Sequence, residues 1–342
     1  NSRRYLQIQS CEYFCFYVGG GTKAVFFADA FSGVETNCSC TPLAMSIAIP
    51  GVVMTVFADK FSGSSTSADD IVNDLLTVAP HDYDCVVGNV AALLGLHRYE
   101  PDRVLGSAFC AAPASDAEGK LSFGHLGARQ LERAVHTGLL RYREFDADGD
   151  LVPSLPYVAI GDAFEMAWTP YHGRKHIEHG FLVLGVDLAF DAYRTITEFG
   201  EAVPTVIADH DLRAVSVQRR MNLLIGDVAT DFTAGPVAYQ DHDAASRYGR
   251  LLDEQMLSLE HLALDTWLVA RARRVNARYR TAYDGRLGEE LAASVEAWTR
   301  SSELVYMALR RSRRGRPVPH TYVDAIAAAL AIDTDIAGRW SQ

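Results

Sequence analysis

The apolar pattern of this 342-residue chain changes near residue 206, and this change constrains the fold more than any other feature. Before it, short apolar and β-branched runs between turns predict strands. These runs are 104–111, 139–145, 157–160, 180–187 and 188–193. After it, apolar residues recur at helical spacing over long stretches, roughly 209–224, 243–280, 286–311 and 319–332. The expected fold class is therefore α+β, with an antiparallel sheet followed by an all-helical domain.

Three regions follow from this division. Residues 1–70 are expected to form a β-rich N-terminal extension of unknown role, because aromatic and β-branched runs there alternate with Gly- and Ser-rich turns. An imperfect Phe-Ala-Asp-x-Phe-Ser-Gly repeat occurs at 27–33 and 57–63. Residues 71–205 are expected to form the α+β domain, and residues 206–342 the helical C-terminal domain.

Charge and hydropathy exclude two classes of partner. The formal net charge is −11, so nucleic acid is not expected, because phosphate binding needs a basic face. No apolar run reaches the roughly 18 residues that would cross a bilayer, so no membrane partner is expected. One basic run, Arg310 to Arg316, contains five arginines. It is either a solvated helix end or a contact for an acidic partner or a phosphate.

The cysteines favour a reducing compartment and no metal. No basic segment followed by an apolar stretch and a cleavage site marks a signal peptide, so a cytoplasmic location is expected. Cys11, Cys15, Cys38 and Cys40 lack the spacing of common zinc sites. The acidic run at 146–150 begins like a calcium loop, but the positions that need Gly and Glu hold other residues, which favours a polar turn. No metal or resident cofactor is expected.

Cys85 is the first candidate for chemistry. It follows the loop 80–84 and precedes residues 86–96, whose apolar spacing predicts a helix. At a helix start, unpaired N–H groups and the helix dipole stabilise a thiolate. The alternative is a small buried apolar side chain.

His179 and Asp191 supply the partners of a thiol site. His179 opens one apolar run and Asp191 ends the next, so a hairpin would bring the carboxylate near the imidazole. A cysteine on a helix, a histidine on a strand and an acid on the neighbouring strand form a papain-like site. His176 is an alternative to His179, and Asp162 and Asp116 are alternatives to Asp191.

These residues also carry a resemblance to a family. The stretch His81-Asp82-Tyr83-Asp84-Cys85-Val86-Val87-Gly88-Asn89 resembles the Asp-Cys-x3-Asn signature of the butirosin biosynthesis H family. A second stretch is similar to that family's next block; it contains Gly161-Asp162, Trp168-Thr169-Pro170-Tyr171, His179, Gly185-Val186-Asp187 and Asp191. The resemblance covers roughly residues 78–215, and residues 1–70 lie outside it.

The resemblance implies a papain-like catalytic domain over residues 71–205 and an acyltransferase activity. In that family an acyl group leaves a carrier-protein thioester, resides on the cysteine and is captured by an amine. Cys85 would be the nucleophile, His179 the general base and Asp191 the residue that orients the histidine. The expected donor is a phosphopantetheine thioester on an acyl carrier protein or CoA, and the expected acceptor is a small-molecule amine.

The remaining site residues are less defined. The glutamine that usually precedes a papain-like cysteine is missing, so the Cys85 N–H is expected to be one oxyanion donor, with Tyr83 or Asn89 as the second. Asp162, Trp168 and Tyr171 are expected either to line the acceptor pocket or to form a packed loop that supports the histidine.

Two other functions use the same residues differently. A thioesterase, an off-loading cyclase or a cysteine peptidase would send the acyl group to water or to an internal nucleophile, and sequence does not separate these from a transferase. A binding protein would keep the fold without the chemistry.

Overall fold

The computed structural model describes residues 82–115, 119–146, 155–185, 188–197, 199–226, 231–283 and 288–340, together with Leu75, Ala229 and the backbone of four short strands near the start. The chain divides into two compact units, Asn1–Ser67 and Ala68–Gln342. In the first unit, β1 (Cys15–Tyr17) pairs with β2 (Thr22–Ala24), and β3 (Ile47–Ile49) pairs with β4 (Val52–Met54). Short strands were expected in this region, where these four lie.

A six-stranded antiparallel sheet lies at the centre of the second unit, in the order β14-β11-β10-β9-β15-β8. Its strands are β8 (Leu140–Asp146), β9 (Tyr157–Asp162), β10 (Glu178–Val183), β11 (Ala189–Asp191), β14 (Thr205–Ile207) and β15 (Val217–Ile225). Successive side chains point to opposite faces. Val158 and Leu182 therefore enter the larger core, and Ala159 and Phe181 enter a smaller one on the other face.

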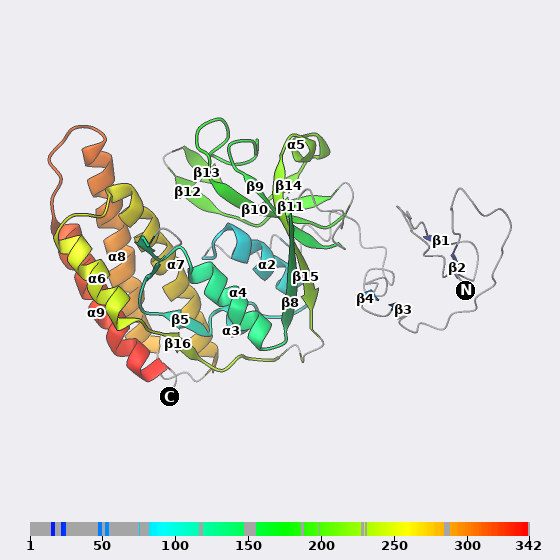
Figure 1. Ribbon diagram of the computed structural model, residues 1–342, viewed down its shortest axis with the longest axis horizontal. Helices are drawn as coiled ribbons and strands as arrows, with labels where there is room; N and C mark the ends of the chain where they lie inside the picture. The colour runs from blue at the N-terminus through cyan, green and yellow to red at the C-terminus, as the bar shows by residue number, and fades with distance from the viewer. Residues whose placement is uncertain are drawn as a thin grey trace, which may run out of the picture. The chain divides into compact units, whose positions relative to one another are not determined.

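Two helices cover the face that carries the larger core, α2 (Cys85–Leu96) and α4 (Leu126–His136) (Figure 1). Residues 87–94 of α2 are all buried, so the helix is covered on every side and lies inside the unit. Val87, Val90 and Leu93 pack in the same cluster as Val158 and Leu182. The first turn of α2 is thereby fixed against the middle of the sheet.

The C-terminal helices are α6 (His242–Asp253), α7 (Leu259–Tyr283), α8 (Gly288–Ser312) and α9 (Thr321–Trp340). They pack side by side in Figure 1 around a core that contains Tyr248, Trp298 and Ile326. The buried guanidinium of Arg273 lies 2.6 Å from the carboxylate of Asp333, which compensates its charge. No helix among the described residues has the length and apolar content to span a membrane.

Short elements join the sheet to the helices. They are α3 (Asp102–Leu105), β5 (Ala108–Cys110), β6 (Ala114–Ser115), β7 (Leu121–Ser122), β12 (Thr195–Thr197), β13 (Gly200–Ala202), α5 (Asp209–Arg213) and β16 (Val237–Tyr239). β16 and β5 form a parallel pair, β6 pairs with β7, and β12 pairs with β13. Gly106, which follows α3, allows a close approach to α7, because a Cβ there would lie 2.5 Å from the Cβ of Tyr279.

The structure corrects the helix predicted over 209–224. Only Asp209–Arg213 is helical, and Val217–Ile225 is the strand between β9 and β8. Pairing on both sides of this strand outweighs the helical spacing of its apolar residues. The helix predicted over 243–280 is two helices, α6 and α7, and the predicted strand 104–111 begins with the last two residues of α3 and contains β5.

The sheet also continues beyond residue 205, where the helical domain was expected to begin. β14 begins at residue 205 and β15 follows it, and the long helices start at His242. Several sequence features lie outside the described residues: the repeat at 27–33 and 57–63, the acidic run beyond 146, and Asp116. Of Cys11, Cys15, Cys38 and Cys40, only the backbone of Cys15 is described.

Candidate active site

Cys85 is the first residue of α2, as predicted, and its side chain is half-buried. Asp84 caps the helix, because its carboxylate accepts a hydrogen bond from the Val87 N–H at 2.7 Å. Burial raises the pKa of Asp84, while the Val87 N–H and the nearby Arg271 guanidinium lower it in part. The sulfur of Cys85 therefore lies at the positive end of the helix dipole.

The first turn of α2 lies directly against β10. A Cβ on Gly180 would be 3.0 Å from Cγ2 of Val86 and 3.3 Å from its Cα, so a larger residue would crowd the start of α2. The buried Asn89 amide donates to the carbonyl oxygens of Cys85 (2.7 Å) and Gly180 (2.9 Å) and accepts from the Ala192 N–H (3.0 Å). Asn89 was expected to bind substrate or an oxyanion; instead it joins α2, β10 and the end of β11.

His179 and Asp191 lie together on the β10–β11 hairpin, as the order of the two runs predicted. His179 Nε2 is 2.6 Å from Asp191 Oδ2, and both side chains are buried. Cys85 is a near neighbour of the same imidazole, because both residues line one pocket and Cys85 raises the pKa of His179. Burial lowers the pKa of His179, but Asp191 and Cys85 outweigh it and raise this pKa to about 10. The imidazole thus favours its protonated form.

Trp168 also contacts Asp191. Its indole N–H donates to Asp191 Oδ2 at 2.9 Å, and its ring packs edge-on against Phe181 with centroids 5.5 Å apart. The Tyr193 backbone N–H donates to the other carboxylate oxygen at 2.9 Å. Trp168 was expected either at the acceptor pocket or in a packed loop that supports the histidine, and its contacts agree with the second, because they fix the carboxylate that holds His179.

Tyr193 connects the histidine to α7. Its ring packs edge-on against His179 at 5.0 Å, and it lines the pocket described below together with Tyr171. Burial raises the pKa of Tyr193. The buried guanidinium of Arg271 lies 5.8 Å from the Tyr193 ring and 4.5 Å from the Trp267 ring. Sequence reasoning missed Tyr193, Trp267 and Arg271, because no local pattern links them to Cys85.

Asp162 and His176 form a separate pair. Asp162 Oδ2 is 2.6 Å from His176 Nδ1, and Oδ1 accepts from the Phe164 N–H (2.9 Å) and the Ile177 N–H (3.2 Å). The His176 ring stacks on Phe164 at 4.3 Å and is largely exposed. Bonds from His176 and these backbone groups lower the pKa of Asp162. His176 and Asp162 were the alternatives to His179 and Asp191, but they pair with each other instead. Asp162 does not line the pocket described below.

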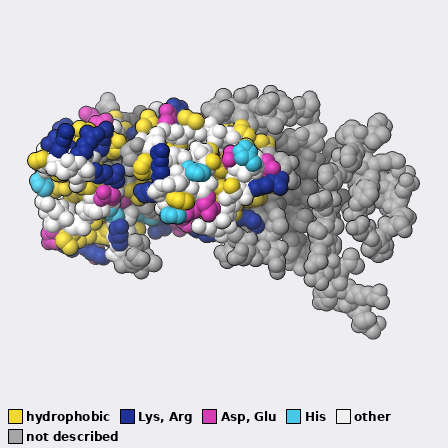
Figure 2. Space-filling model, turned by 90° about the horizontal axis from the view of Figure 1, so that it is seen from above, with side chains coloured by type: hydrophobic (Ala, Val, Ile, Leu, Met, Phe, Trp, Pro, Cys, Tyr) yellow, Lys and Arg dark blue, Asp and Glu magenta, His cyan; other side chains and the backbone are white. Residues whose placement is uncertain are grey.

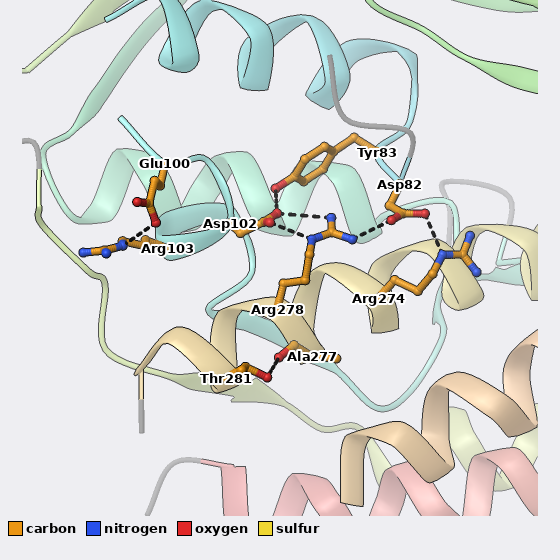
Figure 3. A network of polar contacts seen from close by, with 9 residues as sticks. All are labelled: Asp82, Tyr83, Glu100, Asp102, Arg103, Arg274, Ala277, Arg278 and Thr281. Carbon is orange, nitrogen blue, oxygen red and sulfur yellow. Dashed lines mark hydrogen bonds and ion pairs between the residues drawn. The ribbon is translucent and has the colours of Figure 1, made fainter. Parts of the chain in front are cut away.

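Figure 3 shows how α7 holds the loop before Cys85. Asp82 lies 2.6 Å from both Arg274 and Arg278, and Tyr83 donates to Asp102 at 2.6 Å. Arg278 also contacts Asp102 at 2.7 Å. Burial alone raises the pKa of Asp82, but the two arginines lower it overall. Tyr83, expected as an oxyanion donor, is buried in this network and positions the loop instead.

A pocket of 470 Å³ opens over Cys85 and His179. One wall comes from the sheet side and contains Tyr171, Lys175, Ile177, Glu178, Tyr193, Thr195, Ile196 and Thr197. The opposite wall comes from α7, α8 and the residue after α8, and contains Glu260, Ala263, Leu264, Trp267, Leu268, Ser302, Glu303, Tyr306, Leu309 and Arg313. Of the expected substrate-binding residues Asp162, Tyr171 and Asn89, only Tyr171 is part of it. The helical region, which was expected to help bind the donor or the acceptor, forms half of the pocket.

The arginine run lies at the end of α8. Arg313 lines the pocket, and Arg310, Arg314 and Arg316 are exposed. Figure 2 shows Lys and Arg side chains gathered at the end of the C-terminal helices. A basic surface therefore adjoins the pocket that contains the thiol.

Other chemistry has less support. Cys110 is the second cysteine with a described side chain; it is buried, and burial raises its pKa to about 12. Within the described ranges, no group of three or more His, Cys, Asp and Glu side chains is arranged to hold a metal ion.

Comparison with protein-family models and with curated protein sequences gives no match for this chain. The resemblance to the butirosin biosynthesis H family therefore stays a prediction that rests on the sequence blocks alone. What the site can do follows from its own arrangement: a cysteine at a helix start, a histidine beside it whose pKa is raised, and a fixed carboxylate behind the histidine.

Proposed function

We propose that this chain is a thiol-dependent acyltransferase with a papain-like catalytic core. The observation that carries the proposal is the His179–Asp191 pair, joined at 2.6 Å, in the pocket that Cys85 also lines at the start of α2. This order of groups activates a thiol as a nucleophile. Support for the papain-like core comes from the position of each group: helix start, strand and neighbouring strand.

In the first step the acyl group moves to the enzyme. The thiolate of Cys85 attacks the thioester carbonyl carbon, and the bond from that carbon to the pantetheine sulfur breaks. Protonated His179 gives its proton to the departing thiol. The Cys85 N–H at the start of α2 would donate to the developing oxyanion, which is the kind of contact that stabilises such charge.

In the second step the acyl group moves to an amine. Neutral His179 accepts a proton from the amine as its nitrogen attacks the acyl-enzyme carbonyl, and Cys85 departs as a thiolate. The products are an amide and a free enzyme with its histidine protonated again. The pocket supports an amine acceptor, because Glu303 in its lining offers a carboxylate to an ammonium group, whereas Asp84, Glu178 and Glu260 are already bonded to other groups of the chain.

The donor we propose is a phosphopantetheine thioester on an acyl carrier protein or CoA. The basic surface formed by Arg310, Arg314 and Arg316 beside the pocket supports a donor that carries phosphate or acidic side chains. Such a donor would place the reaction in the cytoplasm.

Intact mass spectrometry tests the proposal. Wild type and Cys85→Ala are incubated with acyl-pantetheine thioesters, with and without small amines. We expect an acyl adduct on wild type only, and its loss when an amine is added. Cys110→Ala is the matched control, because it removes the buried cysteine and should keep the adduct.

Other outcomes separate the alternatives. An adduct that water discharges as fast as any amine would indicate a thioesterase and overturn the transferase. No adduct from any donor would overturn acyl transfer and favour a cysteine peptidase or a binding protein. Alkylation of Cys85 by iodoacetamide distinguishes these two, because a peptidase needs a reactive thiol.

A further inference from the structure

One face of α7 leads from the surface to the thiol. Its pocket residues are Glu260, Ala263, Leu264, Trp267 and Leu268, which recur at i, i+3, i+4, i+7 and i+8 and so share one side of the helix. The next turn places Arg271 over the rings of Trp267 and Tyr193. From Glu260 to Arg271 this stripe is about 16 Å long at 1.5 Å per residue. The residues of the stripe between Glu260 and Arg271 are all apolar.

The other walls continue this apolar surface. Tyr306 and Leu309 of α8 face it from one side, and Ile177 and Ile196 from the other. Exposed fractions are 78% for Ile196, 47% for Leu264 and 37% for Tyr306. Large apolar residues from three separate elements thus remain open to water around one hollow, which is typical of a binding site for an apolar group.

Most charged groups in the lining already have partners. Glu178 lies 2.7 Å from Arg219, Glu260 lies 3.8 Å from Arg313, and Asp84 caps α2. A charged or amide-rich group laid along the α7 stripe would lose water without gaining hydrogen bonds there, which is costly. A hydrocarbon loses nothing of this kind and gains burial.

We infer that the acyl group carried by Cys85 is a hydrocarbon chain that lies along the α7 stripe. This inference rests on the proposed acyl transfer and names its substrate class. The pantetheine arm contains amides, so it leaves the site along the polar rim near Lys175 and Glu303 rather than along α7.

The test measures the rate of Cys85 acylation by intact mass spectrometry with acetyl, butyryl, hexanoyl and octanoyl pantetheine thioesters, and with the succinyl thioester as a charged donor. We expect the rate to rise about fourfold for each added methylene, which is the burial free energy of one such group. Succinyl should react more slowly than butyryl, which has the same number of carbons.

Two variants locate the effect. Leu264→Asp places a charge on the stripe and should lower the ratio of the octanoyl rate to the acetyl rate at least tenfold. Met307→Asp is the matched control, because Met307 is 55% exposed on α8 and lies outside the pocket lining; it should keep the ratio of wild type.

The outcomes separate the inference from the function beneath it. If all donors acylate Cys85 at similar rates, or succinyl reacts fastest, the hydrocarbon class is wrong while acyl transfer stands. A ratio that Leu264→Asp leaves unchanged also overturns the placement along α7. If no donor acylates Cys85, both the proposed function and the inference fail.

Discussion

Trp168 donates its indole N–H to the same oxygen of Asp191 that contacts His179, at 2.9 Å and 2.6 Å respectively. The carboxylate is therefore fixed from two sides by residues on different segments. A backbone N–H holds its second oxygen. This arrangement keeps the imidazole plane oriented toward Cys85 and keeps water away from the pair.

Replacing Trp168 should weaken the site without removing any reacting group. In Trp168→Phe the ring still packs near Phe181, but the hydrogen bond to Asp191 is lost. We expect Cys85 acylation to slow about tenfold and the free energy of unfolding to fall by about 2 kcal/mol. Acylation kinetics and urea denaturation measure the two effects. An acylation rate equal to that of wild type would show that Trp168 does not position Asp191.

His179 should make the stability depend on pH. Its pKa rises from 6.5 to about 10 in the folded protein, because Asp191 and Cys85 outweigh the effect of burial. A group whose pKa is higher in the folded than in the unfolded state stabilises the folded protein fully at pH values below its unfolded pKa. This stabilisation is lost as the pH rises through the folded pKa. We expect the free energy of unfolding to fall between about pH 6.5 and pH 10.

Urea denaturation across this pH range measures that effect. His179→Gln is the control, because it lacks the titrating group, and its free energy of unfolding should change less with pH. Equal pH dependence in the two proteins would contradict the prediction.

The local parts of the site could be predicted from the sequence. α2 was predictable because a polar loop with a capping Asp84 leads directly into a continuous apolar run. The His179–Asp191 contact was predictable because two adjacent apolar runs form a hairpin with the two residues near the same end. Both inferences need only neighbours in the sequence.

The long-range parts could not be predicted. β15 lies between β9 and β8, and its place depends on pairing with strands more than 50 residues away. Trp267 and Arg271 reach the site from a helix about 180 residues after Cys85. Asn89 follows the sequence pattern of a site residue, but the approach of β10 and β11 decides that its amide binds backbone instead.

The ion pairs of Asp82 should matter for reactivity more than for stability. Arg278→Met removes contacts to Asp82 and Asp102 that hold the loop before Cys85. Because the Arg278 side chain is 42% exposed, solvent screens these pairs and the free energy of unfolding should change by less than about 1 kcal/mol. The acylation rate should fall several-fold, since the start of α2 is less fixed.

Arg339→Met is the control for this variant. Its side chain is also 42% exposed and pairs with Asp335 on the same helix, outside the pocket lining. Acylation should be that of wild type. If Arg278→Met and Arg339→Met acylate equally fast, the loop does not depend on α7 for its position.

The arginine run gives a prediction about the donor. Arg314 and Arg316 are exposed beyond the end of α8, close in sequence to Arg313 at the pocket. If they contact the acidic surface or the phosphate of a carrier-bound donor, Arg314→Glu combined with Arg316→Glu should raise KM for that donor at least tenfold and leave kcat near wild type, because the reacting groups are untouched.

The reaction of a small acyl thioester without phosphate is the internal control and should not change. Raising the salt concentration should also raise KM for the carrier-bound donor in wild type, and less so in the variant. A loss of both reactions together would show that the substitutions disturb α8 and the pocket, and that the run is not a docking surface.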